Sequence, residues 1–229
     1  MAALFFDYWG TLVDNYSIAE VLVPYVYSFR KANVIAEEWR RHQKWMMFYL
    51  TLAERFVPHP ECTEAALRHT LEKFHAPVSE QGIKDIMGKY QQLRAFPDVP
   101  DGLRRLKGQG HMLRIVGNPA RWMLEEGSEH AGIRKYFDQI VSSTDETKTC
   151  KPSPKTFQLG LSLAGVPKEQ VLWVTGHFWE VIGADGQGIK TAWINRMNVP
   201  PDYIGVTPTY RTRTLAELAE VLEQQNGRV

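Results

Sequence analysis

Five short apolar runs constrain the fold of this chain more than any other feature of its sequence. Each is short enough for a strand and carries few polar residues, as expected of strands buried on both faces of a parallel sheet. Amphipathic helical patterns lie between most of them, and this alternation predicts a doubly wound α/β sheet with helices on both faces. The runs are Ala2–Phe6, Met112–Val116, Phe137–Val141, Val171–Val174 and Thr191–Ile194.

Three further segments have the pattern of helices that would cover such a sheet. Ser153 and Thr214 directly precede two of them and are candidate N-caps, because a hydroxyl oxygen there can accept a hydrogen bond from the first turn. The predicted helices are Leu103–Gly108, Pro154–Ala164 and Leu215–Leu222.

The interval from residue 15 to residue 95 breaks the alternation. It contains consecutive helical patterns punctuated by prolines and follows the first strand directly. We therefore expect a helical cap domain (15–95) over the carboxyl edge of an α/β core domain (1–14 and 96–229), where it could exclude water from a pocket. The predicted cap helices are Ile18–Ala32, Ala36–Arg55, Thr63–Phe74 and Glu80–Leu93.

Composition narrows the classes of partner. A net charge of +1 over 229 residues gives no reason to expect nucleic acid or an anionic membrane surface. The chain has no apolar run near the ~20 residues of a membrane span, and no signal peptide is indicated. Cys62 and Cys150 are too few for a disulfide framework or a metal site, so we expect a cytoplasmic protein with reduced thiols. The tail Gln224–Val229 is expected to fray.

Polar side chains follow four of the predicted strands. Asp7 ends the first, Asn118 follows the second, Lys151 lies after the third, and Glu180 belongs to a polar stretch after the fourth. Because the carboxyl ends of parallel strands share one crevice, these groups should converge there. A lone carboxylate on a buried strand end is well placed to act as a nucleophile.

The motifs that carry these groups resemble those of the haloacid dehalogenase superfamily, and within it the type II L-2-haloacid dehalogenases. The similarity runs over nearly the whole chain. It implies a Rossmann-like core with a helical cap, no metal or other cofactor, and a homodimer. The motifs are Asp7-Tyr8-Trp9-Gly10-Thr11, Trp39-Arg40-Arg41-His42-Gln43, Gly117-Asn118, Lys151-Pro152, Trp179-Glu180 with Gly183-Ala184, and Trp193-Ile194-Asn195-Arg196.

The resemblance also implies a reaction. Asp7 would displace halide from the carbon next to a carboxylate, and water would hydrolyse the resulting aspartyl ester to a 2-hydroxy acid. The binding partners would be a small-molecule carboxylate and halide. Lys151 would keep Asp7 ionised, and Arg40 with Asn118 would hold the halide, although neighbouring Arg41 is an alternative and both arginines could be surface charges.

The remaining predicted roles concern the substrate. Thr11 and the backbone N–H groups of Tyr8 and Trp9 would orient Asp7 and receive the carboxylate. The full set of predicted catalytic residues is Asp7, Thr11, Arg40, Asn118, Lys151, His177 and Glu180. The predicted substrate-binding residues are Tyr8, Trp9, Gly117, Phe157, Thr175, Phe178 and Trp179.

Five of these positions depart from the resembled pattern. Type II enzymes carry serine, tyrosine, serine, asparagine and aspartate where this chain has Gly117, Phe157, Thr175, His177 and Glu180. Two hydroxyls are lost at Gly117 and Phe157, and a lost hydrogen bond to a charged group costs about 1.5–3 kcal/mol, so the hold on the carboxylate should weaken. Either His177 or Glu180 could activate the water.

Aromatic side chains are concentrated near the motifs. Trp9, Phe178 and Trp179 indicate an apolar pocket wall. The cap aromatics have helical spacing, which favours packing between helices over a place in the pocket. They are Trp45, Phe48 and Tyr49.

The leading hypothesis is therefore a metal-independent hydrolase of 2-haloalkanoic acids, or of a strained-ring 2-carboxylate opened by the same displacement. A magnesium-dependent phosphatase is the second hypothesis, but Trp9 replaces the acid expected two positions after the nucleophile, and Glu180 is the only carboxylate of the last motif. A phosphonate hydrolase would need a cap lysine over Asp7, for which Lys44 is the candidate. A non-catalytic protein that binds a small acid is the third class.

Overall fold

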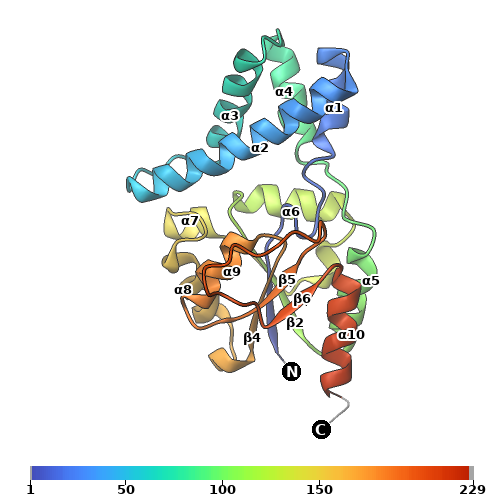
Figure 1. Cartoon of the computed structure of the whole chain (residues 1–229), viewed down its shortest axis with the longest axis vertical. Helices are drawn as coiled ribbons and strands as arrows, with labels where there is room; N and C mark the ends of the chain where they lie inside the picture. The colour runs from blue at the N-terminus through green and yellow to red at the C-terminus, as the bar shows by residue number, and fades with distance from the viewer. Residues whose placement is uncertain (1, 227–229) are drawn as a thin grey trace.

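A six-stranded parallel sheet forms the centre of the computed structural model, which describes residues 2–226 (Figure 1). The strand order is β3-β2-β1-β4-β5-β6, and each neighbouring pair is parallel. The predicted doubly wound α/β fold is confirmed. The strands are β1 Ala3–Phe6, β2 Met112–Gly117, β3 Gln139–Ser142, β4 Val171–Thr175, β5 Lys190–Ile194 and β6 Tyr210–Thr212.

The five predicted strands are all present, and the sixth was missed. The segment predicted as Phe137–Val141 begins two residues later, because a short 3-10 turn, η1 (Arg134–Tyr136), leads into it. The missed strand β6 lies at the edge of the sheet, has three residues and exposes Arg211. A short edge strand with polar residues has no apolar pattern by which to find it.

The two faces of the sheet are covered by different helices. Alternate residues of β1 point to opposite faces. Leu4 and Phe6 belong to the larger core with α5, α6 and α10, and Ala3 and Phe5 belong to a second core with α8 and α9. The helices of the α/β part are α5 Val99–Gly108, α6 Arg121–His130, α7 Ser143–Thr147, α8 Pro154–Leu163, α9 Phe178–Asp185 and α10 Leu215–Asn226, with a second 3-10 turn, η2, at Lys168–Gln170.

One of the two predicted caps is confirmed. The Thr214 hydroxyl accepts a hydrogen bond from the backbone N–H of Glu217 at 3.1 Å. Ser153 precedes α8, but its side chain makes no cap hydrogen bond. The end of the predicted frayed tail, residues 227–229, lies outside the described residues, while Gln224 to Asn226 belong to α10.

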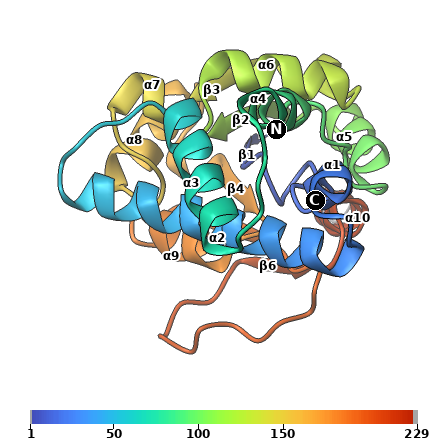
Figure 2. The same ribbon diagram turned by 90° about the horizontal axis from the view of Figure 1, so that it is seen from above.

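Four helices follow β1 and lie over the carboxyl ends of the strands (Figures 1 and 2). The predicted helix Ile18–Ala32 is wrong as one element. The chain leaves the helical conformation at Tyr27, with φ of 53°, and Ser28 starts the next helix by accepting from the Lys31 N–H at 3.2 Å. The helices are α1 Ile18–Val26, α2 Phe29–Leu52, α3 His59–Lys73 and α4 Glu80–Lys89.

Strand β1 lies at the point where the strand order reverses, between β2 and β4. Ligands of open α/β sheets bind in the crevice at such a point, beyond the carboxyl ends of the strands. Residue 7 directly follows β1 and therefore enters this crevice. Among the helices of residues 2–226, none has a stretch long and apolar enough to span a bilayer.

Candidate active site

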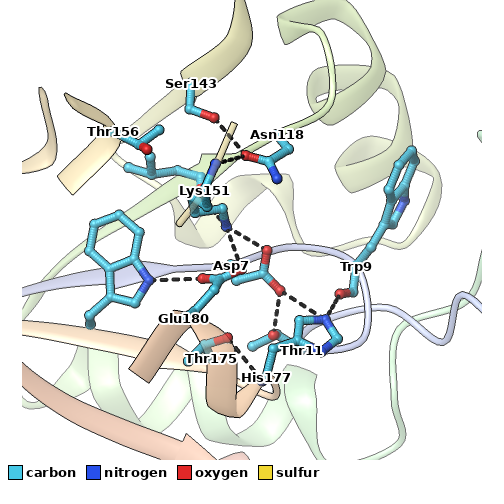
Figure 3. Close-up of polar contacts among 12 residues, drawn as sticks. Asp7, Trp9, Thr11, Asn118, Ser143, Lys151, Thr156, Thr175, His177 and Glu180 are labelled. Atoms are coloured by element: carbon cyan, nitrogen blue, oxygen red, sulfur yellow. Dashed lines mark hydrogen bonds and ion pairs between the residues drawn. The ribbon is translucent and has the colours of Figure 1, made fainter. Parts of the chain in front are cut away.

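Asp7 is held at the end of β1 by hydrogen bonds to both carboxylate oxygens (Figure 3). Lys151 Nζ donates to Oδ1 at 2.6 Å, and the Thr11 hydroxyl donates to Oδ2 at 2.6 Å. The same hydroxyl accepts from the Gly176 N–H at 2.8 Å, which ties the loop after β1 to the loop after β4. Because the hydroxyl has one hydrogen and gives it to Asp7, Thr11 is a positioning group.

Lys151 joins two buried carboxylates. Its ammonium group is fully buried, donates to the Val116 carbonyl at 2.9 Å, and lies 2.9 Å from Glu180 Oε1. The contact with Glu180 is an ion pair that lacks hydrogen-bond geometry, since Oε1 has no hydrogen-bond partner. The other oxygen, Oε2, accepts from the Trp173 indole at 3.0 Å. One cation therefore faces two acids.

This imbalance separates the two carboxyl pKa values. Burial raises the pKa of Asp7, but the charges of Lys151 and His177 and the hydrogen bonds from Lys151 and Thr11 together bring it below its usual value. Burial, followed by the charge of Asp7, raises the pKa of Glu180 to about 8. At neutral pH the cluster holds an ionised Asp7, a cationic Lys151 and a protonated Glu180, which balances the buried charge.

His177 lies beside the nucleophile on the other side. Its Nε2 is 2.8 Å from the Trp9 carbonyl oxygen and 3.7 Å from Asp7 Oδ2. Burial lowers the pKa of His177, so the ring is neutral near pH 7. A carbonyl only accepts, so Nε2 carries the hydrogen in this arrangement and the basic lone pair is on Nδ1. Glu180 instead forms an ion pair with Lys151 and accepts a hydrogen bond from Trp173.

Gly10 makes room for this histidine. Its φ of +81° lies in the left-handed region, and a Cβ there would lie 2.9 Å from the His177 ring. The turn after β1 therefore requires glycine both for its backbone conformation and for the approach of the imidazole.

Arg40 reaches the site from α2 and stacks over the Trp9 ring at 5.0 Å. It donates to the Gln43 amide oxygen and the Tyr90 hydroxyl, and the Asn15 amide oxygen, in the orientation that satisfies both groups, accepts from Nε at 2.8 Å and Nη2 at 3.0 Å. These partners are neutral, so the charge of Arg40 stays uncompensated. Arg41 instead pairs with Glu38 at 2.7 Å and is largely exposed.

Asn118 follows β2 and has a fixed orientation. Its Oδ1 accepts from the Ser143 hydroxyl and from the Lys151 backbone N–H, each at 2.8 Å (Figure 3). With the oxygen used as an acceptor twice, the amide Nδ2 is the end left to donate, and Asn118 lines the cavity. An N–H donor placed there can bind an anion.

A cavity of about 840 Å³ opens above Asp7, between α2 and the ends of the strands. Five of the seven predicted catalytic residues line it; Thr11 and Lys151 do not, and both hydrogen-bond to the Asp7 carboxylate instead. The predicted wall residues Trp9 and Trp179 also line it, with Trp179 stacked on His177 at 5.4 Å and packed edge-on against Phe48 at 5.1 Å.

Of the three cap aromatics, Phe48 lines this cavity, while Trp45 and Tyr49 are 55% and 51% exposed. The expectation that these aromatics pack between helices and away from the pocket is therefore wrong: Phe48 lines the cavity, and Trp45 and Tyr49 are exposed. Trp45 and Tyr49 share the helical spacing of Phe48 but lie on the exposed side of α2.

Five predicted substrate-binding side chains do not line the cavity, contrary to expectation. Three are aromatic and point into the cores. The Tyr8 hydroxyl packs against Gly127 of α6, Phe157 packs on Trp173 at 4.7 Å, and Phe178 packs on Trp193 at 4.9 Å.

The other two, Gly117 and Thr175, are placed by local packing. A Cβ at Gly117 would lie 2.8 Å from a methyl group of Leu124, so the position faces α6. Thr175 is fully buried and its hydroxyl accepts from the His177 N–H at 3.1 Å. The loss of hydroxyls at residues 117 and 157 therefore concerns groups behind the cavity wall.

Several supporting residues were not predicted. Trp173 bonds Glu180, Tyr90 and Asn15 bond Arg40, and Ser143 bonds Asn118. These residues lie in different elements and follow no spacing in the sequence, so no signal pointed to them. Within residues 2–226 there is no group of three or more His, Cys, Asp or Glu side chains that could hold a metal ion.

Comparison with known proteins agrees with this geometry. A model of haloacid dehalogenase-like hydrolases matches residues 1–185. The chain is 31% identical over 217 residues to an (S)-2-haloacid dehalogenase of Pseudomonas fluorescens, covering 95% of this chain and 94% of that protein. An (S)-2-haloacid dehalogenase of Pseudomonas sp. (strain YL) is 29% identical over 226 residues, covering 97% and 95%.

A solved structure is similar over the same extent. The crystal structure of the L-2-haloacid dehalogenase RSc1362 superimposes with a TM-score of 0.92 at 30% identity, covering 97% of this chain and 99% of that chain. The resemblance drawn from the motifs is confirmed, and the chain belongs to the haloacid dehalogenase-like hydrolase family.

Proposed function

We propose that this protein is a metal-independent hydrolase that removes halide from 2-haloalkanoic acids through an ester on Asp7. The observation that carries the proposal is a buried carboxylate, kept ionised by Lys151 and Thr11, at the floor of a cavity with an uncompensated arginine. Similarity to proteins named (S)-2-haloacid dehalogenase supports the choice of substrate.

In the first step an oxygen of Asp7 attacks carbon 2 of the substrate from the side opposite the halogen. A carbon–oxygen bond forms, the carbon–halogen bond breaks, and its electron pair leaves with the halide. Arg40 supplies positive charge and Asn118 Nδ2 supplies a donor where that negative charge develops. Since the Thr11 hydrogen is committed to Asp7, the backbone N–H groups of Tyr8 and Trp9 receive the carboxylate in this proposal.

In the second step water attacks the ester carbonyl of Asp7. Esterification removes the negative charge that raises the pKa of Glu180, and it leaves Lys151 with one acid to balance. Glu180 then loses its proton to solvent and accepts one from the attacking water. The ester breaks, the alkoxide takes up a proton, and Asp7 returns as a carboxylate. Overall, water and the haloacid give a 2-hydroxy acid, halide and one proton.

The test is halide release from L-2-chloropropionate in the presence of EDTA. Wild-type protein should release halide, and Asp7→Asn should lower the rate by about 10⁴-fold or more, because it removes the nucleophile. Asp202→Asn is the matched control, since this carboxylate is exposed and does not line the cavity. Mass spectrometry of a peptide containing residue 7, after rapid quenching with substrate, should show the ester adduct.

Three results would contradict the proposal. Failure to release halide from any short 2-haloacid would exclude the substrate class. EDTA-sensitive release of phosphate from a phosphomonoester would indicate the magnesium-dependent phosphatase. A small acid that binds without turnover or an adduct on Asp7 would indicate the non-catalytic class.

Three broader features belong to the same proposal. The chain divides into a core domain (1–14 and 96–229) and a cap domain (15–95), it forms a homodimer, and it works in the cytoplasm. The four consecutive helices after β1 support the domain division. Light scattering of the purified protein tests the dimer, because a mass near 26.3 kDa would identify a monomer.

A further inference from the structure

Lys44 is a cation of the cavity that the proposed reaction does not use. It belongs to α2, one helical turn after Arg40, and lines the cavity with His177 and Trp179. The side chain is half-buried. Within residues 2–226 no acid lies within ion-pair distance of its ammonium group, and the ammonium donates no hydrogen bond to another residue.

Among residues 2–226, the other arginine and lysine side chains at the cavity all have partners. Arg41 pairs with Glu38 at 2.7 Å and Arg196 with Asp98 at 2.6 Å, and Lys151, which does not line the cavity, pairs with Asp7 at 2.6 Å. Arg40 has neutral oxygens on its guanidinium. Lys44 thus differs from its neighbours in having donors free to bind a ligand.

The surroundings of Lys44 favour an incoming anion. Burial, and then the charges of Arg40 and Arg41, lower the pKa of Lys44; burial lowers the pKa of His177, and the Lys44 charge acts in the same direction. Of these charges, those of Arg40 and Lys44 have no acidic partner among residues 2–226, whereas Arg41 is paired with Glu38. A bound carboxylate would relieve that repulsion and satisfy the ammonium donors. Glu37 also lines the cavity, but it is exposed, two turns away on α2, and forms no ion pair.

The cavity has more room than a three-carbon acid needs. Its volume of about 840 Å³ is in the upper part of the range of about 300–1,000 Å³ that holds drug-sized ligands. Part of the wall is apolar, formed by Met47 and Phe48 of α2 and by Trp179 of α9. A substrate chain can follow this wall from Asp7 toward Lys44.

We propose that the preferred substrate is a 2-halo acid whose chain carries a second carboxylate, and that Lys44 is the specificity-determining residue that binds it. This inference rests on the proposed function for its reaction centre. The apolar wall contacts the methylene groups of the chain, and Lys44 binds the distal carboxylate. Seen from above, α2 lies beside α9 (Figure 2), and Phe48 of α2 packs on Trp179 of α9 at 5.1 Å.

The test compares matched pairs of acids that differ only in the distal group. The pairs are 2-chlorosuccinate with 2-chlorobutyrate, and 2-chloroadipate with 2-chlorohexanoate. Wild-type protein should prefer the diacid of at least one pair by about 10- to 100-fold in kcat/KM, and Lys44→Met should lower that ratio by a similar factor, since a hydrogen-bonded charge pair has about this effect. Lys31→Met, on the same helix but outside the cavity lining, should keep the wild-type ratio.

A binding measurement separates this inference from the proposed reaction. Calorimetry with adipate and hexanoate, which have no halogen, should show tighter binding of adipate to wild type and loss of that preference in Lys44→Met. If this holds without halide release from any acid, the reaction is wrong and the Lys44 site stands. Equal losses on diacids and monoacids would place Lys44 on the common carboxylate and overturn the inference, as would an unchanged ratio or no preference for adipate.

Discussion

The two walls of the cavity carry charge in opposite ways. At the sheet edge, Lys151 pairs with Asp7 and lies within ion-pair distance of Glu180, and all three side chains are buried. On α2, Arg40 and Lys44 have no acidic partner among residues 2–226. The sheet edge balances its own charge and holds its groups in fixed positions, whereas the helical wall keeps positive charge available. The first arrangement suits a reaction centre and the second suits binding of an anion.

The largest effect on this difference between the two walls is expected from Lys151→Met, which removes the cation that balances the charge at the sheet edge. Asp7 and Glu180 would lose their buried partner, and an uncompensated buried charge costs about 3–5 kcal/mol. We expect the free energy of unfolding, measured by urea denaturation, to fall by that amount and halide release to fall to background.

Two further variants test whether the loss of stability comes from the buried charges. Lys155→Met removes an exposed lysine from the same region and should leave the free energy of unfolding within about 0.5 kcal/mol of wild type. Adding Glu180→Gln to Lys151→Met should recover part of the lost stability, because one acid then remains. Equal stability of Lys151→Met and Lys155→Met would show that the cluster is not charge-coupled.

A second prediction concerns the proton that Glu180 carries at neutral pH. Folding raises the pKa of Glu180 from 4.5 to about 8, through burial and the charge of Asp7. Between these values the unfolded chain has released a proton that the folded chain keeps, so this group lowers the free energy of unfolding as pH rises from about 5 to about 8. Wild type should therefore lose stability relative to Glu180→Gln over that window, by up to about 1.4 kcal/mol per pH unit.

The measurement is urea denaturation of both proteins at several pH values. Glu169→Gln, which changes an exposed carboxyl, is the control and should follow the wild-type curve. Parallel curves for wild type and Glu180→Gln would mean that Glu180 is already ionised at low pH, and that the proposed transfer of its proton during catalysis is wrong.

The sheet-edge wall was more predictable from the sequence than the helical wall. Asp7, Asn118, Lys151 and Glu180 follow buried strands, and parallel strands bring their carboxyl ends together, so their convergence required only the strand pattern. On α2 the sequence favoured Arg40 but left Arg41 as an alternative. The choice between them depends on Glu38, Asn15 and Tyr90, contacts that arise only when the helices pack.

Side-chain direction was the other source of error. Tyr8 and Phe178 each adjoin a residue that does line the cavity, yet both point into a core. Neighbouring residues in extended chain or at a helix start face different ways, so nearness in sequence to a site residue does not place a side chain in the site. The break at Tyr27 was missed for a related reason, because a left-handed residue other than glycine has no clear signature.

The smallest expected effect compares the two arginines of α2. Arg40→Met removes an uncompensated charge from the cavity, and kcat/KM for halide release should fall by about 10- to 100-fold, the effect of losing a charged hydrogen-bond donor. Arg41→Met removes a charge already paired with Glu38 at an exposed site, where ion pairs contribute about 0–1 kcal/mol, so kcat/KM should change by less than about threefold. If the loss in Arg41→Met matched that in Arg40→Met, the general positive potential of α2 would matter, and the distinction between paired and unpaired cations would fail. A loss confined to Arg40→Met would indicate that the departing halide is bound by the Arg40 guanidinium, which is stacked on Trp9 and held by neutral oxygens.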